Sequence, residues 1–110
     1  MARYLVQPPV EDIRLADVMR ALSEDVRLRL VSVLADGEFH SCKPEEFEVG
    51  VHKSTLSHHF KVLREAGVTT THLDGRNHSI RLRREDLNAR FPGLLDAVLH
   101  ELASRQAVTG

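Results

Sequence analysis

One stretch of the chain, residues 53–64, combines apolar side chains at helical spacing with short polar and basic ones. Leu56, Phe60 and Leu63 recur at intervals of four and three residues, which is typical of a helix with one apolar side. The other candidate side chains are hydrogen-bonding groups and cations: Lys53, Ser54, Thr55, Ser57, His58, Lys61 and Arg64. Short groups near a helix N-terminus can reach base edges in a major groove, and cations further along suit phosphates. This chemistry is that of DNA recognition. The alternative is an ordinary solvated helix face. Such a face would carry acidic residues, and residues 53–64 contain none.

A basic hairpin is predicted directly after this helix. Residues 68–73 and 78–82 are rich in β-prone side chains and are joined by the turn-forming sequence Asp74-Gly75-Arg76-Asn77. Such a hairpin can bind phosphates or enter a minor groove, as a wing does. The alternative is that its charges only protect an exposed strand edge. The candidate wing residues are Arg76, Asn77 and His78 at the tip, with Arg81 and Arg83 on the returning strand.

Charge is segregated along the chain in a way that the net charge of −1 conceals. Residues 52–84 contain seven basic and two acidic side chains, together with five of the seven histidines, whereas the segments on either side are acidic. Binding to phosphate requires a local positive field, which the average over the whole chain does not report. The middle third of the chain therefore predicts a nucleic-acid partner.

The rest of the chain predicts the elements that position this helix and hairpin. A first helix is expected over residues 12–22, and a second, with Ser23 as its N-cap, runs to a stop at Gly37. Pro44 begins a short helix, and another helical segment begins at Arg84. After an interruption at residues 91–93, a last helix carries Leu94, Leu95, Val98, Leu99 and Leu102. The predicted fold is mainly α with a small β-hairpin, a winged helix-turn-helix. It spans residues 12–103, between a loosely held extended arm, residues 1–11, and a flexible tail, residues 104–110.

Two segments resemble a known family. Residues 21–31, ALSEDVRLRLV, look like the opening of the ArsR/SmtB repressors, and residues 54–68, STLSHHFKVLREAGV, are similar to the recognition helix of that family. Asp74-Gly75-Arg76 resembles its wing tip, and the resemblance covers residues 12–103. It implies control by an effector and an operator in double-stranded DNA bound through Ser54, Thr55, Ser57, His58 and Lys61. It also implies a homodimer in which the first and last helices pair with their mates, with Ile13, Leu95, Val98, Leu99 and Leu102 as the candidate dimerisation residues.

The metal sites of metal-sensing relatives are incomplete here. His40-Ser41-Cys42 offers a single thiolate, which cannot close a soft-metal site that needs three or four ligands. Asp96 and His100 are four residues apart on the last helix, and two such pairs meeting across a dimer axis would hold a divalent transition metal. We expect neither a metal nor another cofactor, and we expect the metal-free dimer to bind DNA. The alternative is a self-contained metal sensor built on Asp96 and His100.

Other function classes receive less support from the sequence. The chain has no Gly-rich phosphate loop, HExxH or GxSxG motif, so no enzyme is predicted. A single cysteine, no apolar run near 20 residues and an N-terminus interrupted by prolines and acids predict a cytoplasmic protein. Two alternatives stay open. One is a winged-helix adaptor whose basic face binds an acidic protein, and the other is a DNA-binding protein whose effector is sensed by a separate partner protein.

Overall fold

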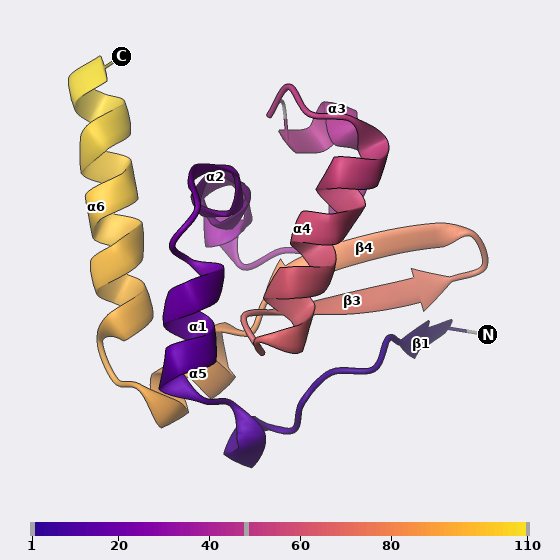
Figure 1. Cartoon of the computed structure of the whole chain (residues 1–110), viewed down its shortest axis with the longest axis horizontal. Helices are drawn as coiled ribbons and strands as arrows, with labels where there is room; N and C mark the ends of the chain where they lie inside the picture. The colour runs from indigo at the N-terminus through magenta and orange to yellow at the C-terminus, as the bar shows by residue number, and fades with distance from the viewer. Residues whose placement is uncertain (1, 48, 110) are drawn as a thin grey trace.

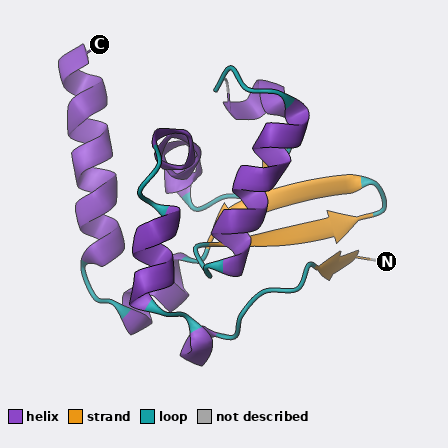
Figure 2. Ribbon diagram, in the orientation of Figure 1, coloured by secondary structure: helices purple, strands orange, loops and turns teal. Residues whose placement is uncertain are grey.

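The computed structural model describes the backbone of residues 2–47 and 49–109 and the side chains of residues 3–47 and 49–105. The α-helices are α1 (Leu15–Ala21), α2 (Asp25–Val33), α3 (Pro44–Phe47), α4 (Lys53–Glu65), α5 (Arg84–Arg90) and α6 (Leu94–Thr109). The strands are β1 (Ala2–Tyr4), β2 (His40–Ser41), β3 (Thr69–Asp74) and β4 (Asn77–Leu82), and two 3₁₀ turns are η1 (Val10–Asp12) and η2 (Leu34–Asp36). The predicted mainly helical fold with a β-hairpin is confirmed (Figure 2).

The core forms where α4 packs between α2 and the sheet. Helices α1, α2 and α4 lie between the sheet and the long helix α6, which stands at the opposite edge of the molecule (Figure 1). The apolar stripe predicted for α4 is buried: Leu56 is 1% exposed, Phe60 6% and Leu63 0%. Ile80 of β4 and Leu30 of α2 belong to the same cluster. Burial of these aliphatic side chains is the main favourable contribution to folding.

The sheet is larger than the hairpin that the sequence predicts. Strands β3 and β4 pair from Thr69 opposite Leu82 to Asp74 opposite Asn77, as expected, but the strand order is β1-β3-β4-β2. Short strands β1 and β2 therefore cover both edges of the hairpin and satisfy backbone groups that would otherwise be unpaired. Strands of three and two residues are too short to show the alternating pattern on which strand prediction depends.

The N-terminal arm is attached to the sheet, which differs from the loosely held arm that we expected. Tyr4 of β1 pairs with His72 of β3, and the amide of Leu5 donates to the carbonyl of Thr71 at 2.9 Å. Further along, Arg83 donates to the carbonyl of Pro8 at 2.7 Å. The open edge of β3 supplies the partners that make residues 2–8 part of the fold.

Two helix N-termini also differ from the prediction. The expected helix over residues 12–22 is interrupted at Ile13, whose extended backbone separates η1 from α1 and places its side chain in the core, 1% exposed. Glu24, and not Ser23, caps α2, because its carboxylate accepts from the amide of Val26 at 3.1 Å. The Ser23 hydroxyl instead donates to the Arg20 carbonyl at the end of α1, at 2.7 Å.

The C-terminal segment continues a helix where we expected a flexible tail. Helix α6 runs to Thr109, so residues 104–109 are helical in their backbone, and Gly110 lies outside the described residues. Among the described residues, no helix is long and apolar enough to cross a membrane.

The close approach of Gly67 to Ile13 generates a prediction about stability. A Cβ at Gly67 would lie 2.6 Å from Ile13 Cγ1, and the backbone φ is +86°. Gly37 has φ +79° with no atom within 4 Å of its ideal Cβ, so Gly37→Ala measures left-handed strain alone. We expect Gly67→Ala to lower the free energy of unfolding by about 1–3 kcal/mol more than Gly37→Ala does, because overpacking adds to strain. Urea denaturation checks this, and equal losses in the two variants would contradict the steric argument.

Candidate nucleic-acid interface

Helix α4 presents the side chains predicted to recognise DNA. Its 13 residues begin after His52, and no acidic residue occupies the first turn, so the partial positive charge of the helix N-terminus is not neutralised by its own helix. The side chains that share the solvent-facing side are Lys53, Ser54, Thr55, Ser57, His58 and Lys61, all exposed. This face agrees with the sequence-based prediction for these six residues.

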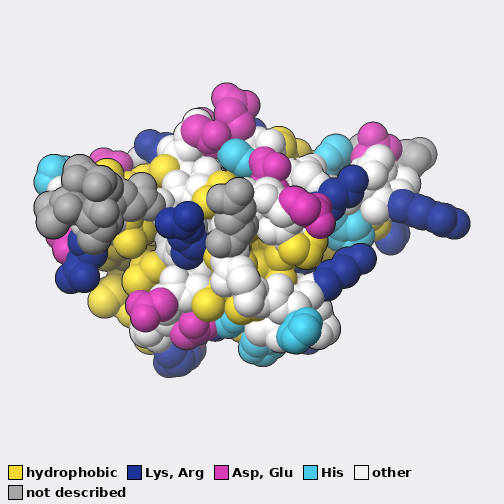
Figure 3. Space-filling model, turned by 90° about the horizontal axis from the view of Figure 1, so that it is seen from above, with side chains coloured by type: hydrophobic (Ala, Val, Ile, Leu, Met, Phe, Trp, Pro, Cys, Tyr) yellow, Lys and Arg dark blue, Asp and Glu magenta, His cyan; other side chains and the backbone are white. Residues whose placement is uncertain are grey.

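The wing places its basic tip beside this helix. Asp74 and Asn77 pair across the two-residue turn Gly75-Arg76, and Gly75 has φ +62°, a conformation that glycine adopts without strain. Arg76, Asn77 and His78 are exposed. Seen from above, lysine, arginine and histidine side chains gather at the end of the molecule that carries the wing (Figure 3).

A groove of about 770 Å³ lies between α3, α4 and the wing. Among the described residues, Glu45 is the only acidic one in its lining. Lys43, which the sequence analysis did not single out, belongs to this lining; it precedes the four-residue helix α3 and has no periodic pattern to mark it. The basic residues that line the groove are Lys43, Lys53, Lys61, Arg64, Arg76 and His78. The structure thus joins the helix and wing residues into one positively charged concave surface.

Three of the arginines predicted to bind DNA differ from the expectation: Arg81 and Arg83 lie outside the groove, and Arg64 lies in it but is half-buried. Arg83 follows the last residue of β4 and is buried, 8% exposed. Arg81 points to the face of the sheet away from α4, because its neighbours Ile80 and Leu82 are buried toward the helices and side chains alternate along a strand. Its guanidinium lies over the ring of Phe39, 4.5 Å from the centroid. Arg64 lines the groove but is half-buried, and its Nε is buried without a hydrogen-bond partner among the described residues.

A polar cluster joins α4 to the N-terminus of α2. Arg27 Nη1 lies 3.1 Å from His59 Nδ1 and 3.3 Å from Glu24 Oε2, and Arg27 Nε donates to the Ala21 carbonyl at 2.6 Å. Nδ1 of His59 also lies 3.2 Å from Glu24 Oε2, so this nitrogen faces both a donor and an acceptor. Burial lowers the pKa of His59, while Glu24 opposes the shift and Arg27 and His58 add to it. His59, 8% exposed, is thus a packing and positioning group.

A second histidine links β2 to the elements on either side of it. His40 Nε2 lies 2.9 Å from Asp36 Oδ2, and its Nδ1 lies 2.8 Å from Glu46 Oε1 in α3. These carboxylates, Asp36 foremost, raise the pKa of His40 against the effect of burial. The imidazole bonds one carboxylate with each nitrogen, so the three groups do not converge on a common point.

The residues considered as metal ligands lie apart. Burial raises the pKa of the Cys42 thiol to about 11, which disfavours the thiolate that a metal requires. Asp96 and His100 are exposed on α6. Within the part of the chain that the structure describes, no three His, Cys, Asp or Glu side chains are grouped as a metal site would require.

The candidate dimerisation residues divide into two groups. Ile13 and Leu95 are 1% and 2% exposed and pack in the chain's own core, so they have little surface to offer a second copy. Val98, Leu99 and Leu102 are only half-buried on α6. The sequence analysis missed Leu15 and Met19 of α1, which are 49% and 54% exposed. Their separation by four residues puts them on one face of a helix, and this signal was available from the sequence.

Relatives in sequence carry the names of transcriptional regulators and repressors. A family model described as a helix-turn-helix domain matches residues 22–72. The uncharacterized HTH-type transcriptional regulator YceK of Bacillus subtilis is 32% identical over 96 residues, which span 86% of this chain and 96% of that protein. The arsenical resistance operon repressor of Staphylococcus xylosus is 33% identical over 75 residues, which span 67% of this chain and 70% of that protein.

Solved structures are similar over most of the chain. The crystal structure of a possible transcriptional regulator for arsenical resistance has a TM-score of 0.60 and 30% identity, covering 81% of this chain and 95% of that one. The transcriptional repressor BigR from Xylella fastidiosa has a TM-score of 0.56 and 31% identity, covering 70% of this chain and 85% of that one.

The lowered pKa of His59 generates a prediction about pH. The pKa of His59 in the folded state lies below the usual value of 6.5. Between these two pKa values the unfolded chain binds more protons than the folded one. The stability due to His59 is therefore lost as pH falls from about 6.5 through the folded-state pKa. His59→Asn keeps an acceptor for Arg27 but cannot be protonated. We expect the wild type to lose more unfolding free energy than His59→Asn between pH 7 and pH 5. An NMR titration of the His59 ring measures the pKa directly, and a value at or above 6.5 would refute the assignment.

Proposed function

The chain belongs to the ArsR/SmtB family of winged helix-turn-helix transcriptional regulators, and on that premise we propose that it binds a palindromic operator as a homodimer. The observation that carries the proposal is the continuous cationic surface formed by the acid-free face of α4, the groove and the wing tip. In this arrangement α4 enters the major groove with Ser54, Thr55 and Ser57 nearest the bases. Lys61 and Arg76 then lie to either side, where they bind phosphates.

The homodimer is supported by apolar surface on α1 and α6. Met19 and Leu15 are exposed on α1, and Val98, Leu99 and Leu102 are half-buried on α6, so each helix has apolar side chains that a second copy could cover. Apolar side chains are visible at the end of the molecule that carries α6 (Figure 3). A two-fold axis through this surface presents two α4 helices to two half-sites, with centres about 10 bp apart or a multiple of it.

The form that binds DNA in this proposal is the metal-free dimer, released by an organic effector or by a partner protein. Two properties of the donor groups support this. The Cys42 thiol holds its proton at neutral pH, and His40 is engaged by carboxylates on both of its nitrogens.

The proposed roles of α4 in base recognition and of the wing in phosphate binding can be tested separately on DNA. We expect His58→Ala to weaken binding to an operator selected in vitro from random DNA by about 1–3 kcal/mol, with a smaller loss on random sequence. Arg76→Ala removes a phosphate contact, so it should weaken binding to both DNAs. It should also reduce the slope of log affinity against log salt concentration by about one. Fluorescence anisotropy at several salt concentrations measures both effects. Arg20→Ala, which removes an exposed cation on α1, is the matched control, and unchanged affinity in His58→Ala and Arg76→Ala would defeat the proposed interface.

Dimerisation has its own test. Met19→Asp places a charge on the exposed apolar face of α1 without altering the core. We expect it to raise the dissociation constant of the dimer at least tenfold, as measured by sedimentation equilibrium. Val6→Asp is the control, because Val6 is 92% exposed on the arm. A wild-type protein that stays monomeric at micromolar concentration would exclude the homodimer.

A further inference from the structure

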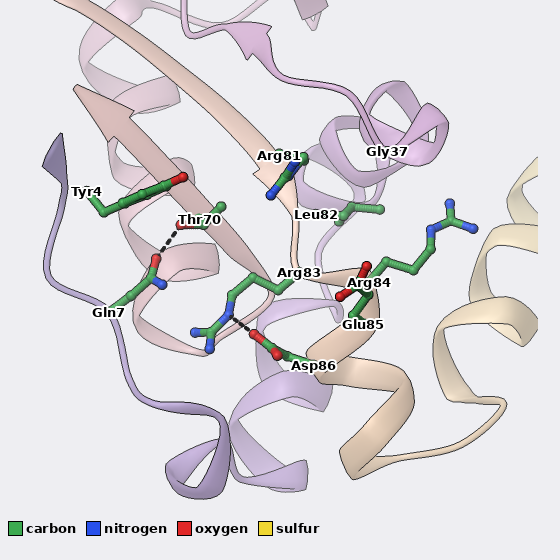
Figure 4. Close-up of a pocket in the computed structure, with 10 residues that line it drawn as sticks. All are labelled: Tyr4, Gln7, Gly37, Thr70, Arg81, Leu82, Arg83, Arg84, Glu85 and Asp86. Atoms are coloured by element: carbon green, nitrogen blue, oxygen red, sulfur yellow. Dashed lines mark hydrogen bonds and ion pairs between the residues drawn. The ribbon is translucent and has the colours of Figure 1, made fainter. Parts of the chain in front are cut away.

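A cavity of about 390 Å³ lies on the face of the sheet opposite α4, between the N-terminal arm and the beginning of α5 (Figure 4). Its volume falls within the range of small-molecule sites in proteins. We call it the arm pocket and define it by five of its lining residues: Tyr4, Gln7, Thr70, Arg81 and Arg83. The hydroxyl of Thr70 donates to the Gln7 amide oxygen, which holds the arm as one wall of the cavity.

Arg83 is a buried cation in the wall of the arm pocket. The residue is only 8% exposed, which is unusual for a charged side chain. Its Nε donates to Asp86 at 2.9 Å and its Nη1 donates to the Pro8 carbonyl at 2.7 Å, whereas Nη2 has no acceptor among the described residues. In Figure 4 the guanidinium points toward the arm, beside Gln7. The fold thus holds the Arg83 guanidinium in a fixed position, with Nη2 free to donate hydrogen bonds.

Arg81 supplies a second cation in the arm pocket. Unlike Arg83, which is paired with Asp86, it has no acidic partner among the described residues. No carboxylate among the described side chains lies within ion-pair distance of its guanidinium, which is stacked on Phe39 instead. Stacking occupies the face of the guanidinium and leaves its N–H edge available for the two parallel bonds that a carboxylate accepts. Of the other charged lining residues, Asp86 is paired with Arg83, Arg84 donates to the Ala35 carbonyl, and Glu85 is exposed.

Exposed aromatic rings flank the arm pocket. Tyr4 is 56% and Phe39 36% exposed, and His72 lies between them with ring centroids 5.1 Å and 5.8 Å away. Figure 4 shows the Tyr4 ring across the cavity from Arg81. A flat apolar body would be covered by the tyrosine ring while its charged end meets the two arginines.

We infer that the arm pocket binds a small planar carboxylate, with Arg81 and Arg83 holding the carboxylate group and Tyr4 covering the ring. The site lies on the face of the sheet away from the DNA-binding groove, so a ligand there does not compete with DNA for the same side chains. Ligand binding is independent of the proposed function. If the chain binds an operator, this ligand is the organic effector that the proposed function calls for, because β1 pairs with β3 of the wing.

The test uses the full-length protein and benzoate as the probe, with benzamide as its neutral counterpart of the same shape. NMR spectra that resolve the arginine Nε–H groups report binding at Arg81 and Arg83. We expect benzoate to shift both signals and to bind at least tenfold more tightly than benzamide. Arg81→Gln should weaken benzoate binding at least tenfold, and Tyr4→Ala should weaken it as well, while Arg20→Ala leaves it unchanged. Amide spectra of each variant show whether it is folded.

Three outcomes would overturn the inference. Equal binding of benzoate and benzamide would mean that the cations do not recognise the ligand. Shifts confined to the groove residues Lys53, Lys61 and Arg76 would mean that benzoate only follows the positive charge of the DNA-binding face. A loss of operator affinity in probe-free Arg81→Gln would assign Arg81 to the DNA interface. Absence of operator binding by the unliganded wild type would refute the proposed function and leave the benzoate result standing.

Discussion

Burial of the apolar stripe of α4 is the constraint on which the rest of the structure depends. Leu56, Phe60 and Leu63 can be removed from water only if α4 lies against α2 and the sheet, and a helix has one orientation that satisfies all three. The ring of Phe47 meets that of Phe60 edge-on at 5.2 Å, which attaches α3 to the same core. The polar side of α4 then faces outward as a consequence of packing. The proposed DNA-binding face is therefore the complement of the hydrophobic one.

Polar contacts refine the position that packing sets. Arg27 links the end of α1, the cap of α2 and His59 of α4, so the relative placement of α2 and α4 is held by directional hydrogen bonds as well as by apolar contact. His40 does the same for α3 through Asp36 and Glu46. The two histidines respond to pH in opposite directions, because burial lowers the pKa of His59 and carboxylates raise that of His40. The stability due to His40 is complete below its usual pKa of 6.5 and is lost as pH rises through its raised pKa, whereas that due to His59 is complete above 6.5 and is lost as pH falls through its lowered pKa.

The alternation of side chains along β4 separates two sites that share one hairpin. His78 faces the groove beside α4, and Arg81, three residues on, faces the arm pocket on the other side. Strand β1 closes the arm pocket and also pairs with β3 up to Asp74, at the wing turn. The N-terminal arm is therefore in contact with both the candidate ligand site and the element that carries Arg76.

The sequence by itself determined the elements whose signal is local. The spacing of Leu56, Phe60 and Leu63, the stop at Gly37 and the turn at Gly75 are properties of a few neighbouring residues, and each is found where predicted. Arg81 shows the limit of such reasoning: composition marks the hairpin as basic, but the face that each arginine occupies is set by which neighbours are buried. Only the tertiary structure decided the strand role of residues 2–4, the burial of Ile13 under Gly67 and the cap at Glu24. The first two depend on partners more than 50 residues away, so no pattern within a short window could reveal them. The cap depends on which of two adjacent side chains bonds the end of α1, and here Ser23 bonds the Arg20 carbonyl and leaves Glu24 to cap α2.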